Sequence, residues 1–233
     1  MPRQLGLELR YTGKRGGYRP GAGRPKTSKL QSHGKREPFL GREPLHLTLR
    51  LRAGMPSLRR KDVHRALRES VLKARRKGLA VIQFAFLSNH IHLIVESSGK
   101  GDLGRAMQSF GISFGKRLNA ILKRSGAVFT ERYHRVVLRT PTQVRNALRY
   151  VLANEFQHGG GRARVDLDRY SSALIWPENA WERLLGRQWR RLVGVPERDP
   201  VLAKEDLILV SELVAPAGTW LLRTGWTRAA ALP

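Results

Sequence analysis

The pattern of apolar and polar positions predicts that the first half of the chain opens with a strand and a helix. Residues 45–52 alternate strictly, with leucine at each odd position and a polar residue at each even one, which is typical of a half-buried strand. Residues 57–77 carry apolar side chains at helical spacing. Ser57 is the predicted N-cap of this helix, and Gly78 is its predicted stop.

Two apolar runs follow, at residues 79–87 and 90–96, and the two-residue break between them predicts a β-hairpin. Asp102 is the predicted N-cap of a second helix, in which Phe110 and Phe114 recur at the spacing of buried positions. A fourth strand is expected within residues 133–139.

A third helix has the clearest start signal in the chain. Thr140 is its predicted N-cap, Pro141 occupies the first helical position, and Gln143 completes a capping box. The order strand, helix, strand, strand, helix, strand predicts an α+β, ferredoxin-like (split βαβ) antiparallel sheet with two helices on one face. The third helix is an addition to that arrangement.

Composition shifts divide the chain into three segments: a basic tail at 1–43, a catalytic domain at 44–158, and a C-terminal extension at 159–233. The tail is expected to be disordered, and its Gly-Arg-Pro-Lys core, with Arg24 and Lys26, resembles an AT-hook that fits a narrow minor groove. A solvated basic linker is the alternative. The extension follows a run of three glycines, and we expect it to be partly helical and to pack on the domain or contact DNA.

The charge balance favours a polyanionic partner. The chain has 44 Lys and Arg against 18 Asp and Glu, a net charge of +26, and a surface of that kind binds nucleic acid with a steep salt dependence. An arginine bias from a GC-rich genome is an alternative source of part of the excess. No apolar run approaches the ~20 residues that span a bilayer, so we expect no membrane association and a cytoplasmic, nucleoid-associated protein.

The absence of cysteine excludes thiolate metal sites, so any metal must be held by nitrogen or oxygen ligands, and Mg²⁺ or Mn²⁺ is favoured. His90 and His92 stand two apart on a predicted strand and therefore point to the same face. Such a pair can bind one divalent ion and leave positions open for water and substrate. On spacing alone, an exposed polar sheet face is the competing interpretation.

Tyr150 and Asn154 lie four apart on the third helix, so they share a face one turn from each other. Asn154 can supply a third metal ligand through its carbonyl oxygen, and Tyr150 can act as the nucleophile. Tyr133 is the other candidate nucleophile, but a strand-edge position offers it no ligand at i+4. A tyrosine packed in the core is the alternative for Tyr150.

Three segments of the region from about Leu45 to Gln157 match a known family pattern: Ser88-Asn89-His90-Ile91-His92-Leu93-Ile94-Val95, Phe129-Thr130-Glu131-Arg132-Tyr133-His134 and Arg149-Tyr150-Val151-Leu152-Ala153-Asn154. This region resembles the single-tyrosine HUH transposases of insertion sequences, most closely their REP-associated tyrosine transposase branch. The resemblance implies a metal-dependent transesterification on single-stranded or hairpin DNA. His90, His92 and Asn154 would hold the metal, and Tyr150 would form a 5′-phosphotyrosine intermediate and free a 3′-hydroxyl. Insertion-sequence members commonly have Gln where this chain has Asn154, and the shorter amide needs a closer helix.

Several arginines near Tyr150 are candidate phosphate ligands on either side of the cut. These arginines are Arg132, Arg135, Arg139, Arg145 and Arg149.

The sequence leaves two properties open: whether the protein is a monomer or a homodimer, and which DNA sequence it recognises.

Three other functions compete with this one. HUH replication initiators and relaxases share the histidine pair and the tyrosine, although initiators commonly add a helicase domain. A non-catalytic, domesticated nucleic-acid-binding protein would use the same sheet, but such sheets usually display aromatic residues for stacking. Two-histidine phosphoesterases need two His-x-Thr motifs, whereas this chain has one, His46-Leu47-Thr48.

Overall fold

A four-stranded antiparallel sheet forms the centre of the described part of the chain. The computed structural model describes residues 37–153, 165–167, 169–187, 189–194 and 200–229. The sheet and its helices are β1 (Leu45–Arg50), α1 (Lys61–Arg75), β2 (Ala80–Phe86), β3 (His90–Glu96), α2 (Lys100–Ile121), β4 (His134–Val137) and α3 (Pro141–Leu152).

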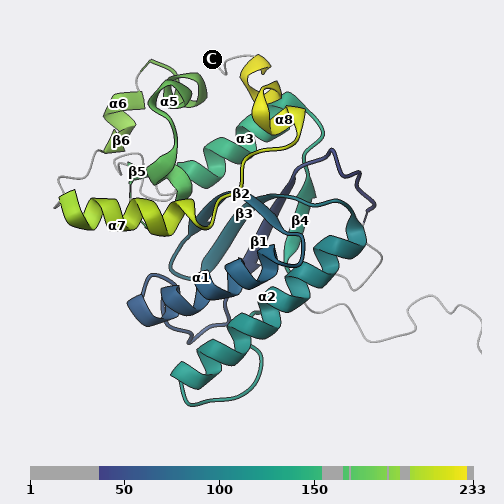
Figure 1. The fold of residues 1–233 in the computed structure, drawn as a ribbon, viewed down its shortest axis with the longest axis vertical. Coiled ribbons are helices and arrows are strands. Elements are labelled where there is room, and N and C mark those ends of the chain that lie inside the picture. Colours follow the sequence, from purple (N-terminus) through teal and green to yellow (C-terminus); the bar gives the residue numbers. More distant parts are fainter. Residues whose placement is uncertain (1–36, 154–164, 168, 188, 195–199, 230–233) are drawn as a thin grey trace, which may run out of the picture. The chain divides into compact units, whose positions relative to one another are not determined.

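The strands run in the order β2-β3-β1-β4, and each neighbouring pair is antiparallel. Helix α1 connects β1 to β2 and helix α2 connects β3 to β4, so two βαβ crossovers interleave in one sheet (Figure 1). This is the ferredoxin-like arrangement, and the predicted α+β class is confirmed.

Helices α1 and α2 cover one face of the sheet, because the strands present their apolar positions there (Figure 1). Leu45 and Leu47 of β1 are completely buried, as is Leu93 of β3. Phe110 and Phe114 of α2 are fully buried in the same cluster and stack with ring centroids 6.0 Å apart. Their predicted role in the core is confirmed.

Helix α3 packs against the opposite face. Its buried Val144 and Leu148 belong to a second apolar cluster that includes Ile94 of β3. The predicted capping box is present: the Thr140 hydroxyl accepts a hydrogen bond from the Gln143 backbone N–H, and the Gln143 side chain accepts one from the Thr140 N–H, both at 3.2 Å. The start of α3 is therefore fixed by local sequence.

The predicted N-caps of the first two helices are wrong. Helix α1 begins after Arg60, because the Leu58 N–H donates to the Ser88 carbonyl at 2.8 Å and ties the preceding segment to the β2–β3 turn. Ser57 instead accepts from the Arg59 N–H in that segment. Helix α2 begins after Gly99, and Asp102 lies within its first turn, where a carboxylate is favourable to the helix dipole.

The described parts of the extension contain helices that pack on α3. Trp181 and Trp226 are buried in the same cluster as Leu148. The predicted boundary near residue 158 and the AT-hook residues Arg24 and Lys26 lie outside the described residues. The elements are β5 (Val165–Asp166), η1 (Ser172–Ile175), α5 (Glu178–Leu185), α6 (Trp189–Leu192), β6 (Val193–Gly194), α7 (Pro200–Ser211), α8 (Trp220–Arg223) and η2 (Gly225–Arg228).

Within these ranges, no helix has both the length and the apolar character needed to cross a membrane.

Candidate active site

Four of the five histidines in the described residues lie on the α3 face of the sheet. In the pairing of β1 with β3 and β4, Thr48 stands opposite both His92 and His134. Directly opposed residues point to the same side of a sheet, and residues two apart on one strand do so as well. His46, His90, His92 and His134 therefore share this face.

His90 and His92 lie side by side, with ring centroids 6.1 Å apart and ring planes within 10° of parallel. Asn89 Oδ1 lies 2.6 Å from His90 Nδ1, and Thr48 Oγ1 lies 3.2 Å from His92 Nδ1. The Asn89 amide oxygen can only accept, so it favours a protonated Nδ1 and a free Nε2 lone pair on His90, and the Thr48 hydroxyl allows the same tautomer on His92.

Tyr150 on α3 lies against His92 and His46. Its ring centroid is 5.1 Å from that of His92, in an edge contact at 85°, and 5.7 Å from that of His46. The phenol is half-buried, so it is neither sealed in the core nor fully in solvent. Asn154, the predicted third ligand, lies outside the described residues.

Tyr133, the other candidate nucleophile, lies away from the histidines. It packs against the core on the α1/α2 side of the sheet, whereas its neighbour His134 faces α3. The structure therefore brings Tyr150, and not Tyr133, to the histidine pair.

His46 is a member of this site that the sequence reasoning did not select. Its ring contacts both His92, at 5.5 Å between centroids, and Tyr150. Burial first, and the nearby positive charge of His134 second, lower the pKa of His46 to about 4, so its imidazole is neutral at pH 7. Its Nε2 is buried without a hydrogen-bond partner in the described structure. The signal was present in the alternation of residues 45–52, whose polar positions include His46 and Thr48.

The residues present fit a catalytic metal site that is only partly built from the described segments. Two imidazoles with oxygen-bound Nδ1 atoms match the nitrogen donors of such a site. No group of three His, Asp or Glu side chains in the described residues is arranged to hold an ion. A third protein ligand, if the site has one, must therefore be a residue of another type or lie outside those ranges.

Four of the five predicted phosphate-binding arginines, Arg132 among them, have interaction partners within the protein. Arg135 donates to the Glu37 carbonyl and lies over the Phe39 ring, and Arg139 pairs with Glu37 at 2.7 Å and Glu43 at 3.0 Å. Arg145 donates to two backbone carbonyls, those of Arg183 and Ala229, at 2.9 and 3.0 Å. Arg132 is exposed and Arg149 is half-buried.

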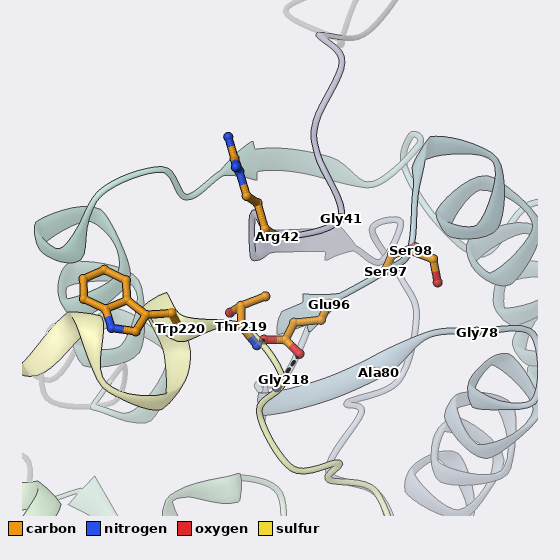
Figure 2. Close-up of a pocket in the computed structure, with 10 residues that line it drawn as sticks. All are labelled: Gly41, Arg42, Gly78, Ala80, Glu96, Ser97, Ser98, Gly218, Thr219 and Trp220. Carbon is orange, nitrogen blue, oxygen red and sulfur yellow. Dashed lines mark hydrogen bonds between the residues drawn. The ribbon is translucent and has the colours of Figure 1, made fainter.

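A separate hollow lies at the opposite end of β3 from His90. Figure 2 shows Glu96 at its floor, with Arg42 and Trp220 at its rim. The Glu96 carboxylate accepts hydrogen bonds from the backbone N–H groups of Gly218 and Thr219, both at 2.8 Å (Figure 2). Glu96 therefore anchors the C-terminal extension to the sheet.

Comparisons with known proteins give a fold match. No protein-family model matches the chain, and no curated protein does so. Among solved structures, a REP-associated tyrosine transposase bound to a REP hairpin matches with a TM-score of 0.50 and 17% identity, over 74% of this chain and 96% of that one. A bacterial tRNA(His) guanylyltransferase-like protein in complex with ATP matches with a TM-score of 0.39 and 11% identity, over 67% of this chain and 70% of that one. The first match supports the fold described above, and at its level of identity it shows the fold alone.

Proposed function

We propose that this protein is a metal-dependent, single-tyrosine DNA transposase or endonuclease of the HUH type, which cleaves and rejoins single-stranded DNA at hairpin or repeat-associated sites. The observation that carries the proposal is the edge contact between the Tyr150 ring and the ring of His92, which has His90 beside it on the same strand and face. Tyr150 as a whole is half-buried, and the proposal requires its phenol oxygen to be open to a substrate.

In this proposal His90 and His92 would hold Mg²⁺ or Mn²⁺, with Asn154 as the third ligand. The ion would supply the charge that polarises the scissile phosphate. The Tyr150 phenol gives up its proton and its oxygen attacks phosphorus, the bond to the 3′-oxygen breaks, and the departing oxygen takes up a proton to become a 3′-hydroxyl, so that protons balance. The phosphotyrosine bond conserves the energy of the cleaved diester, so a 3′-hydroxyl can later attack it and rejoin the strands.

Single-stranded or hairpin DNA is the proposed substrate. The net charge of +26 favours such a polyanion, and the transposase with the same fold is bound to a REP hairpin. The proposal extends to Arg24 and Lys26 of the basic tail as minor-groove contacts, and to a nucleoid-associated protein.

The test is covalent capture of DNA. Labelled hairpin-containing single-stranded DNA is incubated with the protein and Mn²⁺ or Mg²⁺ and resolved on a denaturing gel. We expect a protein–DNA adduct that is absent with EDTA and absent in Tyr150→Phe, because the phenol oxygen forms the bond. Tyr133→Phe is the matched control and is expected to retain the adduct, since Tyr133 packs on the other side of the sheet.

An adduct that persists in Tyr150→Phe, or that forms equally with EDTA, would contradict the proposal. DNA binding without any adduct in the unmodified protein would favour the non-catalytic alternative.

A further inference from the structure

Arg50 stands beside His90 on the face of the sheet that holds the histidines. The two residues are Cα partners at the end of the β1–β3 ladder, and Arg50 is two residues from Thr48, which contacts His92. Opposed residues in an antiparallel pair have Cβ atoms about 4.5–5.5 Å apart and project to the same side. The long side chain of Arg50 therefore starts next to the His90 imidazole.

The Arg50 side chain is exposed and makes no hydrogen bond or ion pair within the described residues. In contrast, Arg135, Arg139 and Arg145 each bind carbonyl or carboxylate oxygens of the protein. A guanidinium with no partner among the described residues has its donors available for a ligand.

The surroundings of Arg50 favour an anion. Across the strands at this end of the sheet, Arg50 pairs with His90, and Thr48 pairs with His92 on one side and His134 on the other. None of these residues carries a carboxylate. A planar guanidinium matches the oxygens of a phosphate diester and can bind two of them at once. The ligand that fits these groups is therefore a phosphate of the DNA backbone.

We propose that Arg50 binds the scissile phosphate beside His90 and stabilises the negative charge that develops on it during attack by Tyr150. This inference rests on the proposed function and adds a residue to its site. The contact strengthens as charge accumulates on the phosphate oxygens, so Arg50 contributes more to the rate of cleavage than to the affinity for DNA.

The experiment compares Arg50→Gln and Arg50→Lys with the control Arg65→Gln. Arg65 is an exposed residue of α1, on the side of the sheet away from His90 and His92, and like Arg50 it makes no side-chain hydrogen bond or ion pair in the described structure. Two quantities are measured for each variant: the single-turnover rate of adduct formation at saturating DNA, and the DNA dissociation constant in a Tyr150→Phe background. Thermal unfolding and direct Mn²⁺ titration check that the fold and the metal site are kept.

We expect Arg50→Gln to slow adduct formation by about 10²–10³-fold, as the loss of one preorganised donor to a developing oxyanion does. Its DNA affinity should stay close to that of Arg65→Gln, since each variant removes one positive charge from the surface. Arg50→Lys should recover part of the rate, because an ammonium keeps the charge and loses the forked geometry.

A rate for Arg50→Gln within about threefold of Arg65→Gln would overturn the proposal, as would a loss of DNA affinity that accounts for the whole effect. If Arg50→Gln fails to fold, Arg50→Lys decides the question by the same comparison. An adduct in the unmodified protein with no effect at Arg50 rejects this inference alone, whereas no adduct in the unmodified protein rejects the proposed function and this inference together.

Discussion

The two faces of the sheet are built from the same strands but differ in chemical character: one is apolar, and the other carries polar side chains. On the side of α1 and α2, the odd positions of β1 are leucines sealed in a continuous apolar core. On the side of α3, the even positions are His46, Thr48 and Arg50, and the helix covers only part of the surface with apolar contacts such as Leu148 to Ile94.

Strand alternation lets one segment serve both purposes, because each residue step reverses the direction of the side chain. The face of α1 and α2 is apolar throughout β1, whereas the face of α3 combines an apolar cluster with exposed polar groups that contribute little to stability. Substitutions of neighbouring residues on β1 and β3 should therefore separate stability from chemistry.

The largest expected effect on stability is on the apolar face. Leu47→Ala should lower the free energy of unfolding by about 2–5 kcal/mol, since it removes a fully buried side chain and leaves a cavity. The exposed His134 of the α3 face is the control, and His134→Ala should change stability by less than about 0.5 kcal/mol. Denaturant titration of both variants measures the difference. Equal losses of unfolding free energy in the two variants would contradict the proposed difference between the faces.

Each face also holds a buried neutral histidine, which makes stability depend on pH. Burial, followed by the charges of Arg169 and Arg68, lowers the pKa of His64 to about 4, and burial does the same for His46. The folded state then binds fewer protons than the unfolded state between about pH 6.5 and 4. The stabilisation is complete above that window and is lost as the pH falls through it.

For His64, which packs against Tyr170 and Phe86, the loss should be on the order of 3 kcal/mol. Urea titrations at pH 7 and pH 4.5 measure it, and His64→Leu should flatten the dependence. A pH profile that is the same in His64→Leu and in the unmodified protein would show that folding does not lower the pKa of this histidine.

The next effect concerns the hydrogen bond between Thr48 and His92. Thr48→Val keeps the shape of the side chain and removes the oxygen that orients the ring, so we expect Mn²⁺ binding to weaken by about 10–100-fold. Thr48→Ser should keep most of the affinity, because it retains the hydroxyl. Calorimetric titration with Mn²⁺ is the measurement, and equal affinity in Thr48→Val and the unmodified protein would remove Thr48 from the site.

The smallest effect is at the start of α3, which carries Tyr150. Thr140→Ala breaks the capping box and should cost about 1 kcal/mol of stability. The rate of adduct formation at saturating DNA should be unchanged at temperatures well below unfolding, because Tyr150 is held by its contacts with His46 and His92. A rate that falls in parallel with stability would show that the helix start also positions the nucleophile.

Local periodicity was enough to predict the fold. The bounds of β3 were predicted to the residue, and the start of α3 followed from its capping box. The starts of α1 and α2 were each misplaced by three residues, since Leu58 is tied to the distant Ser88 by a tertiary hydrogen bond and α2 extends past Asp102 to Gly99.

The sequence could select candidate site residues only from patterns within a single helix or strand. His90 and His92 were selected because they alternate on a single strand, and Tyr150 because it lies on a helix with a clear start. Thr48 and Arg50 were missed because their position beside the histidines depends on the register of β1 with β3, which neither strand encodes alone. The fold of the extension could not be predicted from its tryptophans either. Trp181 and Trp226 are positioned by packing in the same cluster as α3, which is a contact between segments distant in the sequence.

The most direct test of the central claim is to locate the DNA on the protein. After reaction with hairpin-containing single-stranded DNA and Mn²⁺, the adduct is digested with protease and nuclease, and the modified peptide is sequenced by mass spectrometry. The proposed mechanism predicts a 5′-phosphonucleotide on Tyr150 and none on Tyr133. A nucleotide on any other residue, or no modified peptide from a protein that binds the DNA, would contradict it.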